Sequence, residues 1–159
     1  MDKVKRYIPY LLLTGLTLFF CRMFVGRYGI FGAKVDWLSQ HSVLPDYFRQ
    51  QFYATGKIFP EFAPNLGGGQ NIYHFAYYGL YSPLILPSYL LPFVKMSDYI
   101  MVISITGLTV SVLLFYYWLK SRKMDTGVAF IISLMFLLAG PMIGQYSGQI
   151  MFEIGRAHV

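Results

Sequence analysis

A largely apolar run over residues 7–25 constrains this chain more than any other feature. A helix over this run, at 1.5 Å per residue, matches the roughly 30 Å thickness of a bilayer's hydrocarbon core. Lys3, Lys5 and Arg6 precede the run, and no cleavage pattern of the A-x-A type follows it. The sequence therefore predicts an uncleaved signal anchor with a cytoplasmic N-terminus.

The composition also indicates a chain that uses lipid as its solvent. Only 13% of the residues are charged and 56% are apolar, whereas soluble domains have about 25% charged residues. The net charge of +6 could suggest nucleic acid, but the basic residues flank apolar runs, as they do again at Lys120, Arg122 and Lys123. This placement is typical of cytoplasmic anchoring. We expect membrane lipid as a partner and no nucleic acid.

Two further spans are expected at residues 99–119 and 126–143. The linker over residues 120–125 is short and basic, which predicts a helical hairpin with a cytoplasmic turn. The expected fold class is therefore all-α, a polytopic membrane protein with a long extracytoplasmic loop over residues 26–77.

The apolar segment over residues 78–94 decides the topology. It contains Pro83, Pro87 and Pro92, and prolines at this spacing break a continuous helix. If the segment spanned the membrane, the basic linker would face outside, against the positive-inside rule. We favour a re-entrant or interfacial segment, and a fourth span is the alternative.

A short helix is predicted over residues 44–56 of the outer loop. Pro45 suits the first helical turn, Asp46 complements the positive helix start, and Gly56 is a stop signal. Phe48 and Phe52 lie four residues apart and share a face. This face either lies along the outer leaflet or packs on other parts of the same protein.

Three carboxylates of the loop are the candidate acidic groups. Asp36, near the membrane surface, could be a general base or a metal ligand, or else a solvated acid or a helix cap. Asp46 is expected mainly to complement the positive start of the predicted helix, and Glu61 is expected to be solvated or paired. No metal site and no cofactor follow from these residues.

A glycine run, Gly67–Gly69, interrupts the loop. It lacks the Lys-Ser/Thr pair of a P-loop, and no strand is predicted before it. It predicts a tight turn that permits close backbone approach, with contact to a ligand phosphate as the bolder interpretation.

Several long motifs of the loop resemble the bacterial YfhO family of membrane proteins. The motifs are Asp36-Trp-Leu-Ser-Gln40, Pro45-Asp-Tyr-Phe-Arg49, Asn65-Leu-Gly-Gly-Gly-Gln-Asn-Ile-Tyr73, Tyr77-Tyr-Gly-Leu-Tyr-Ser-Pro83, Ser88-Tyr-Leu-Leu-Pro92 and Met96-Ser-Asp-Tyr99. The resemblance covers the chain to about Phe152 and implies the N-terminal part of a longer GT-C-like glycosyltransferase. Such enzymes take a sugar from a polyprenyl-phosphate carrier on the outer face, here toward a cell-envelope polymer such as lipoteichoic acid.

The resemblance also implies roles for particular residues. GT-C enzymes place a functional acid soon after the first span, which makes Asp36 the candidate catalytic base and Asp46 the runner-up. Arg49 is the nearest cation for the phosphate leaving group, with headgroup contact as its alternative role. The remaining candidates for substrate binding are Gln40, Gly67, Gly68, Gly69 and Gln70.

Two other classes of function stay open: a part of a transporter or flippase, and a non-catalytic envelope scaffold. The predicted spans at 99–119 and 126–143 contain no carboxylate or lysine, which disfavours a transport site. The tail over residues 153–159 departs from the pattern of the preceding span. It can be encoded by a common sequencing-adapter sequence, so we interpret it as read-through and residues 1–152 as an N-terminal fragment that is inactive alone.

Overall fold

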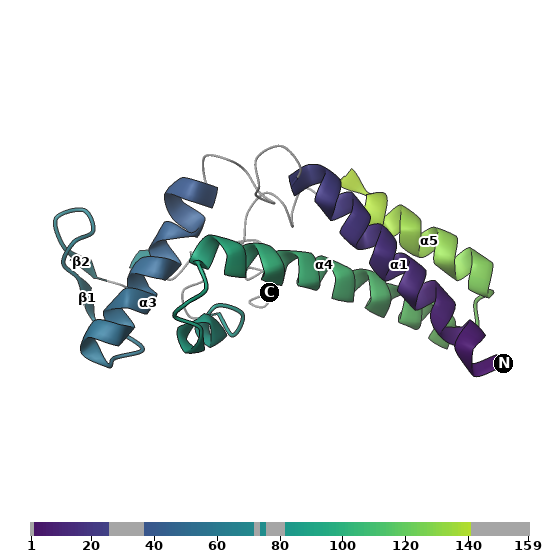
Figure 1. The fold of residues 1–159 in the computed structure, drawn as a ribbon, viewed down its shortest axis with the longest axis horizontal. Helices are drawn as coiled ribbons and strands as arrows, with labels where there is room; N and C mark the ends of the chain where they lie inside the picture. The colour runs from purple at the N-terminus through teal and green to yellow at the C-terminus, as the bar shows by residue number, and fades with distance from the viewer. Residues whose placement is uncertain (1, 26–36, 72–73, 76–81, 141–159) are drawn as a thin grey trace.

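Helices dominate the computed structural model, which describes residues 2–25, 37–71, 74–75 and 82–140 (Figure 1). Helix α1 (Asp2–Val25), helix α4 (Met96–Ser121) and helix α5 (Thr126–Leu138) pack together as a bundle. Helix α3 (Val43–Thr55) lies beyond the end of the bundle at which α4 begins. The predicted all-α fold class is confirmed. The candidate site lies outside the bundle, where α3 meets the chain that leads into α4.

Each helix of the bundle contributes one stripe of residues at helical spacing to a shared core. The core residues are Leu13 and Cys21 of α1, Leu108, Val112, Tyr116 and Leu119 of α4, and Ala129 and Leu137 of α5. Two hydroxyls are buried beside them, and each bonds its own helix: Thr17 Oγ1 donates to Leu13 O at 2.8 Å, and Ser133 Oγ to Ala129 O at 2.8 Å. Because each hydroxyl has an acceptor within its own helix, it needs no partner on the neighbouring helix, and the helix faces can approach closely.

The outer faces of the bundle remain apolar. Leu11, Leu114 and Met135 are 70%, 60% and 68% exposed, and side chains of this kind are stable on the surface only in contact with lipid or another protein. Two helices are long and apolar enough to cross a membrane, over Arg6–Val25 and Met96–Ser121.

Helix α5 is shorter than the span predicted over residues 126–143. It ends at Leu138, and Ala139 is extended. Gly140 is again helical, so the extended Ala139 interrupts the predicted span before Pro141. Residues 141–143 lie outside the described residues.

The segment over residues 82–94 forms turns and a short 3-10 helix, η3 (Leu86–Leu90), rather than a continuous helix. It folds back on the start of α4, because buried Ile85 packs with Met96 and Ile100. The Tyr99 hydroxyl donates to Leu84 O at 2.7 Å. The prolines thus break the helix as predicted, while the re-entrant or interfacial placement stays a prediction.

Helix α3 has the predicted boundaries. Gly56 is left-handed, with φ of 72°, and its N–H donates to Phe52 O at 2.8 Å. The helix packs on the same protein, through Leu44 and Phe48 against Ala63. Of the two interpretations of its apolar face, packing within the protein is therefore observed.

A small hairpin follows α3. Strand β1 (Phe62–Ala63) pairs antiparallel with β2 (Gln70–Asn71). Gly67, Gly68 and Gly69 have φ of 56°, 80° and 100°, so the predicted tight turn is confirmed. At Gly69 the positive φ favours glycine, and a Cβ there would also require the exposed ring of Phe62 to move.

Asp125 caps the start of α5. Its Oδ1 accepts hydrogen bonds from Gly127 N at 2.8 Å and Val128 N at 3.3 Å. The Val128 N–H, then that of Gly127, hold the pKa of Asp125 below its ordinary value. A depressed pKa in the folded state means that this stabilisation is present at neutral pH and is lost as the pH falls through the folded-state value.

We expect Asp125→Ala to lower the thermal unfolding midpoint of the protein in detergent at pH 7, because the first amides of α5 lose their acceptor. The difference from wild type should shrink as the pH falls through the pKa of Asp125. Asp125→Ser, which keeps an acceptor oxygen at the cap, is the control and should unfold near the wild-type temperature. If the alanine variant and the wild type unfold at the same temperature at pH 7, Asp125 does not stabilise the protein as a helix cap.

Candidate functional site

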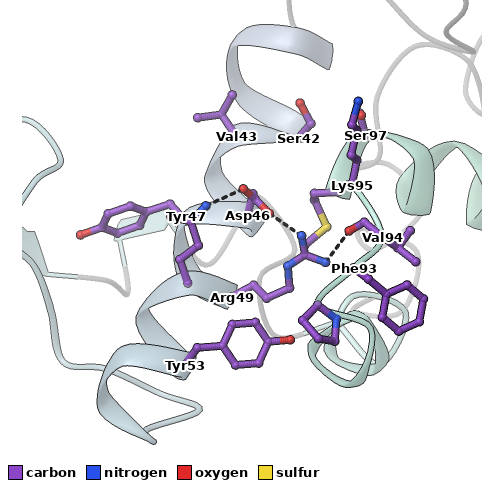
Figure 2. A pocket seen from close by; sticks show the side chains of 13 residues that line it. Ser42, Val43, Asp46, Tyr47, Arg49, Tyr53, Phe93, Val94, Lys95 and Ser97 are labelled. Atoms are coloured by element: carbon purple, nitrogen blue, oxygen red, sulfur yellow. Dashed lines mark hydrogen bonds and ion pairs between the residues drawn. The ribbon is translucent and has the colours of Figure 1, made fainter.

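A cavity of about 690 Å³ opens between α3 and the start of α4 (Figure 2). Its lining comes from one face of α3 and from residues 92–97. The elements that form it, α3 and the start of α4, lie at the end of the bundle opposite the N-terminus (Figure 1). The lining residues are Ser42, Val43, Asp46, Tyr47, Arg49, Gln50, Tyr53, Pro92, Phe93, Val94, Lys95, Met96 and Ser97.

Arg49 joins the two walls of this cavity. The residue is only 5% exposed. Its Nη1 donates to Leu91 O at 3.2 Å and to Val94 O at 2.9 Å, and its Nη2 donates to Asp46 Oδ1 at 2.6 Å. The guanidinium therefore fixes α3 against the chain that enters α4. The sequence predicts contact of Arg49 with phosphate or a lipid headgroup. In the structure, its guanidinium donates hydrogen bonds to oxygen atoms of the protein instead.

Asp46 stands beside Arg49 on the same helical face, as expected for residues three apart. Its side chain is 32% exposed, and its Oδ2 accepts a hydrogen bond from Gln50 Nε2 at 2.8 Å. Each oxygen thus has one protein donor and keeps acceptor capacity toward the cavity. The predicted position of Asp46 in the first turn of α3 is confirmed.

Lys95 brings a second cation to the cavity. It lies directly before α4 and is exposed. With Asp46 and Arg49 it gives the lining two cations and one carboxylate. The excess of one positive charge favours an anionic ligand.

Among the predicted site residues that the structure describes, Asp46 and Arg49 come together at this cavity. Gln40 lies in a short helical turn of π type, η1 (Trp37–His41), and does not line the cavity. Gly67, Gly68, Gly69 and Gln70 belong to the β1–β2 hairpin, where the Gln70 side chain lies over Gly67. Asp36 lies outside the described residues. The roles assigned to these residues stay predictions.

Most residues that line the cavity were not predicted as site residues, among them the polar residues Gln50, Tyr53 and Lys95. Gln50 and Tyr53 follow Asp46 by four and seven residues, so the helical wheel of α3 carried the signal. Tyr53 donates its hydroxyl to Tyr89 O, which ties α3 to η3. Lys95 could have been found as the cation directly before the second long apolar run.

Within the ranges that the structure describes, no group of three or more His, Cys, Asp or Glu side chains is arranged to hold a metal ion. Glu61 is exposed and does not line the cavity.

A family model described as bacterial membrane protein YfhO matches residues 8–152. The chain belongs to this family. The matched region includes the whole of Met96–Ser121, all but the first two residues of Arg6–Val25, and all residues that line the cavity. YfhO membership and the two apolar helices make this a membrane protein. No curated protein and no solved structure matches the chain.

We expect Arg49→Gln to loosen the docking of α3. The variant leaves two backbone carbonyls without their side-chain donor and Asp46 without its cation, at a free-energy penalty of about 1–3 kcal/mol. Hydrogen exchange of the α3 amides in detergent should accelerate correspondingly, and limited proteolysis should cut near residue 56 sooner. Gln50→Ala, which removes a partner of Asp46 that is exposed, is the matched control and should change exchange little. Unchanged protection of α3 in Arg49→Gln would contradict the docking role.

Proposed function

We propose that this chain is the N-terminal part of a membrane glycosyltransferase. It would move a sugar from a polyprenyl-phosphate carrier to a cell-envelope acceptor, such as lipoteichoic acid, on the outer face. The observation that carries the proposal is the cavity that gathers Asp46, Arg49 and Lys95 at one end of the apolar bundle. An anionic lipid-linked donor requires cations at the level where hydrocarbon meets water.

The placement of the basic residues supports an outward-facing cavity. Arg6 and the basic turn that holds Lys120 lie at the other end of the bundle from the cavity. If these cations face the cytoplasm under the positive-inside rule, the cavity faces outward. Residues 26–77 would then be extracytoplasmic.

The transfer step needs a base and a stabilised leaving group. The acceptor oxygen attacks the anomeric carbon, the bond from that carbon to the phosphate oxygen breaks, and the acceptor proton passes to a carboxylate. Asp36 remains the first candidate base, because of its position in the sequence soon after the first span. Asp46 remains the runner-up, since an acceptor hydroxyl would compete there with Arg49 and Gln50.

The departing phosphate carries negative charge and needs a cationic partner. Lys95 is exposed at the cavity, and its ammonium group can supply three donors. Arg49 is nearly buried and already donates to three oxygens. We therefore assign the hydrogen bond to the phosphate first to Lys95. The buried positive charge of Arg49 would stabilise the phosphate without direct contact.

Asp36→Asn should abolish sugar transfer while expression persists, because loss of a general base typically costs about 10²–10⁴-fold in rate. The assay is incorporation of labelled sugar from a polyprenyl-phosphate donor by the full-length gene product in membranes. Asp46→Asn tests the runner-up in parallel. Glu61→Gln, at an exposed acid outside the cavity, is the control and should be fully active. Undiminished transfer by the Asp36 variant would exclude that residue as the base.

Lys95→Gln should raise KM for the polyprenyl-phosphate donor about 10-fold or more, since a hydrogen bond to a charged group contributes roughly 1.5–3 kcal/mol. Lys57→Gln removes the same charge from an exposed position outside the cavity and should leave KM unchanged. Equal KM values for the Lys95 variant and wild type would place the donor phosphate elsewhere.

A further inference from the structure

A second cavity, of about 710 Å³, lies at the end of the bundle that carries the N-terminus. It is formed where α1 begins, α4 ends and α5 begins. Its lining is cationic and rich in hydroxyls: Arg6, Pro9, Tyr10, Tyr116, Tyr117, Lys120, Ser121 and Thr126. The glycosyltransferase proposal makes no use of it.

Two cations from two different helices line this cavity. Lys120 Nζ donates to Met124 O at 2.8 Å and to Thr126 Oγ1 at 3.0 Å, which holds the ammonium group in place and leaves one of its three donors. Among the side chains that the structure describes, which begin at Arg6 itself, the guanidinium of Arg6 has no hydrogen-bond or ion-pair partner. No carboxylate lines the cavity, and Asp125, beside Thr126, directs Oδ1 to the amides of α5. Asp125 acts electrostatically on Lys120 from outside the cavity, and the described lining itself carries two cations and no carboxylate.

The cavity lies at the boundary between hydrocarbon and water. The first apolar span begins at Arg6 and the second ends at Ser121, and both residues line the cavity. The Tyr10 and Tyr116 rings pack edge to face, with centroids 4.9 Å apart. Tyrosines with a polar tip favour this interfacial level.

An exposed apolar stripe leads from the cavity along α4 into the membrane. Tyr117 lines the cavity and is 60% exposed. Leu114 and Val110 follow on the same helical face and are 60% and 47% exposed. A ligand with an anionic head and an apolar chain would satisfy the cations and the stripe together.

We propose that this cavity binds the phosphodiester headgroup of an anionic phospholipid. The phosphate lies between Arg6 and Lys120, and an acyl chain follows the stripe of Tyr117, Leu114 and Val110. The lipid thereby bridges the start of α1 and the end of α4. Basic cavities between membrane helices bind anionic headgroups by this combination of charge and apolar contact.

Native mass spectrometry of the protein, freed of lipid in a zwitterionic detergent, tests the proposal. Phosphatidylglycerol and phosphatidylcholine with identical acyl chains are the probes. We expect one phosphatidylglycerol to be retained in preference to phosphatidylcholine. Arg6→Gln and Lys120→Gln should each weaken phosphatidylglycerol about fivefold, as removal of one cation near a lipid phosphate predicts.

Matched variants keep the test specific. Lys123→Gln removes the same charge from the same basic turn but outside the cavity, and should bind like wild type. Lys120→Arg keeps the charge and should retain the lipid, while Arg6→Gln disturbs no hydrogen bond of the described fold. Equal weakening by Lys123→Gln, or no weakening by Arg6→Gln, overturns the proposal. Glycerol phosphate binding as tightly as the lipid would also overturn it, because the ligand would then be a soluble phosphate.

Discussion

The buried guanidinium of Arg49 is the interaction on which the outer part of this structure depends. Removing such a cation from water is costly, and the structure offsets this with one carboxylate and two backbone carbonyls. The acceptors belong to two segments far apart in the chain, Asp46 in α3 and residues 91–94 before α4. Because all must meet at one fork-shaped group, the position of α3 is specified. The cavity and its carboxylate follow from this arrangement.

The two cavities arise from one constraint acting at both ends of the bundle. Charged side chains are expensive inside the hydrocarbon core, so the cations gather where the apolar helices end. At the end that carries the N-terminus, Arg6 and Lys120 line a cavity without a carboxylate. At the other end, Asp46 balances one of two cations. The cavity of Arg6 and Lys120, with cations alone, suits stable lipid binding. The cavity of Asp46, Arg49 and Lys95, which also has a carboxylate, suits a site where a proton must be accepted.

Local signals in the sequence predicted much of the fold. The apolar runs at 7–25 and 99–119 lie inside α1 and α4, and Pro45 and Gly56 mark the start and end of α3. The glycine run forms the predicted turn. Each of these features is determined by residues close together in the chain, so the sequence alone is enough to predict it.

The site was less predictable, because its contacts join residues distant in the chain. The carbonyls that bind Arg49 lie 42 and 45 residues away, and no side-chain pattern identifies a carbonyl as an acceptor. An exposed arginine for phosphate and a buried one for docking look alike in sequence. The apolar face of α3 was equally ambiguous, since lipid and protein select the same residue types.

The prolines of the segment before α4 explain why the docking is possible at all. In a continuous helix, each interior carbonyl accepts the amide four residues later, and the side-chain donors that also reach such carbonyls in α1 and α5 come from the same helix. Pro83, Pro87 and Pro92 prevent that pattern, and the chain instead forms turns and η3. Four carbonyls of this segment then accept side-chain donors: Leu84 from Tyr99, Tyr89 from Tyr53, and Leu91 and Val94 from Arg49. A continuous helix would use these carbonyls for its own backbone hydrogen bonds, so the broken helix and the cavity beside α3 depend on each other.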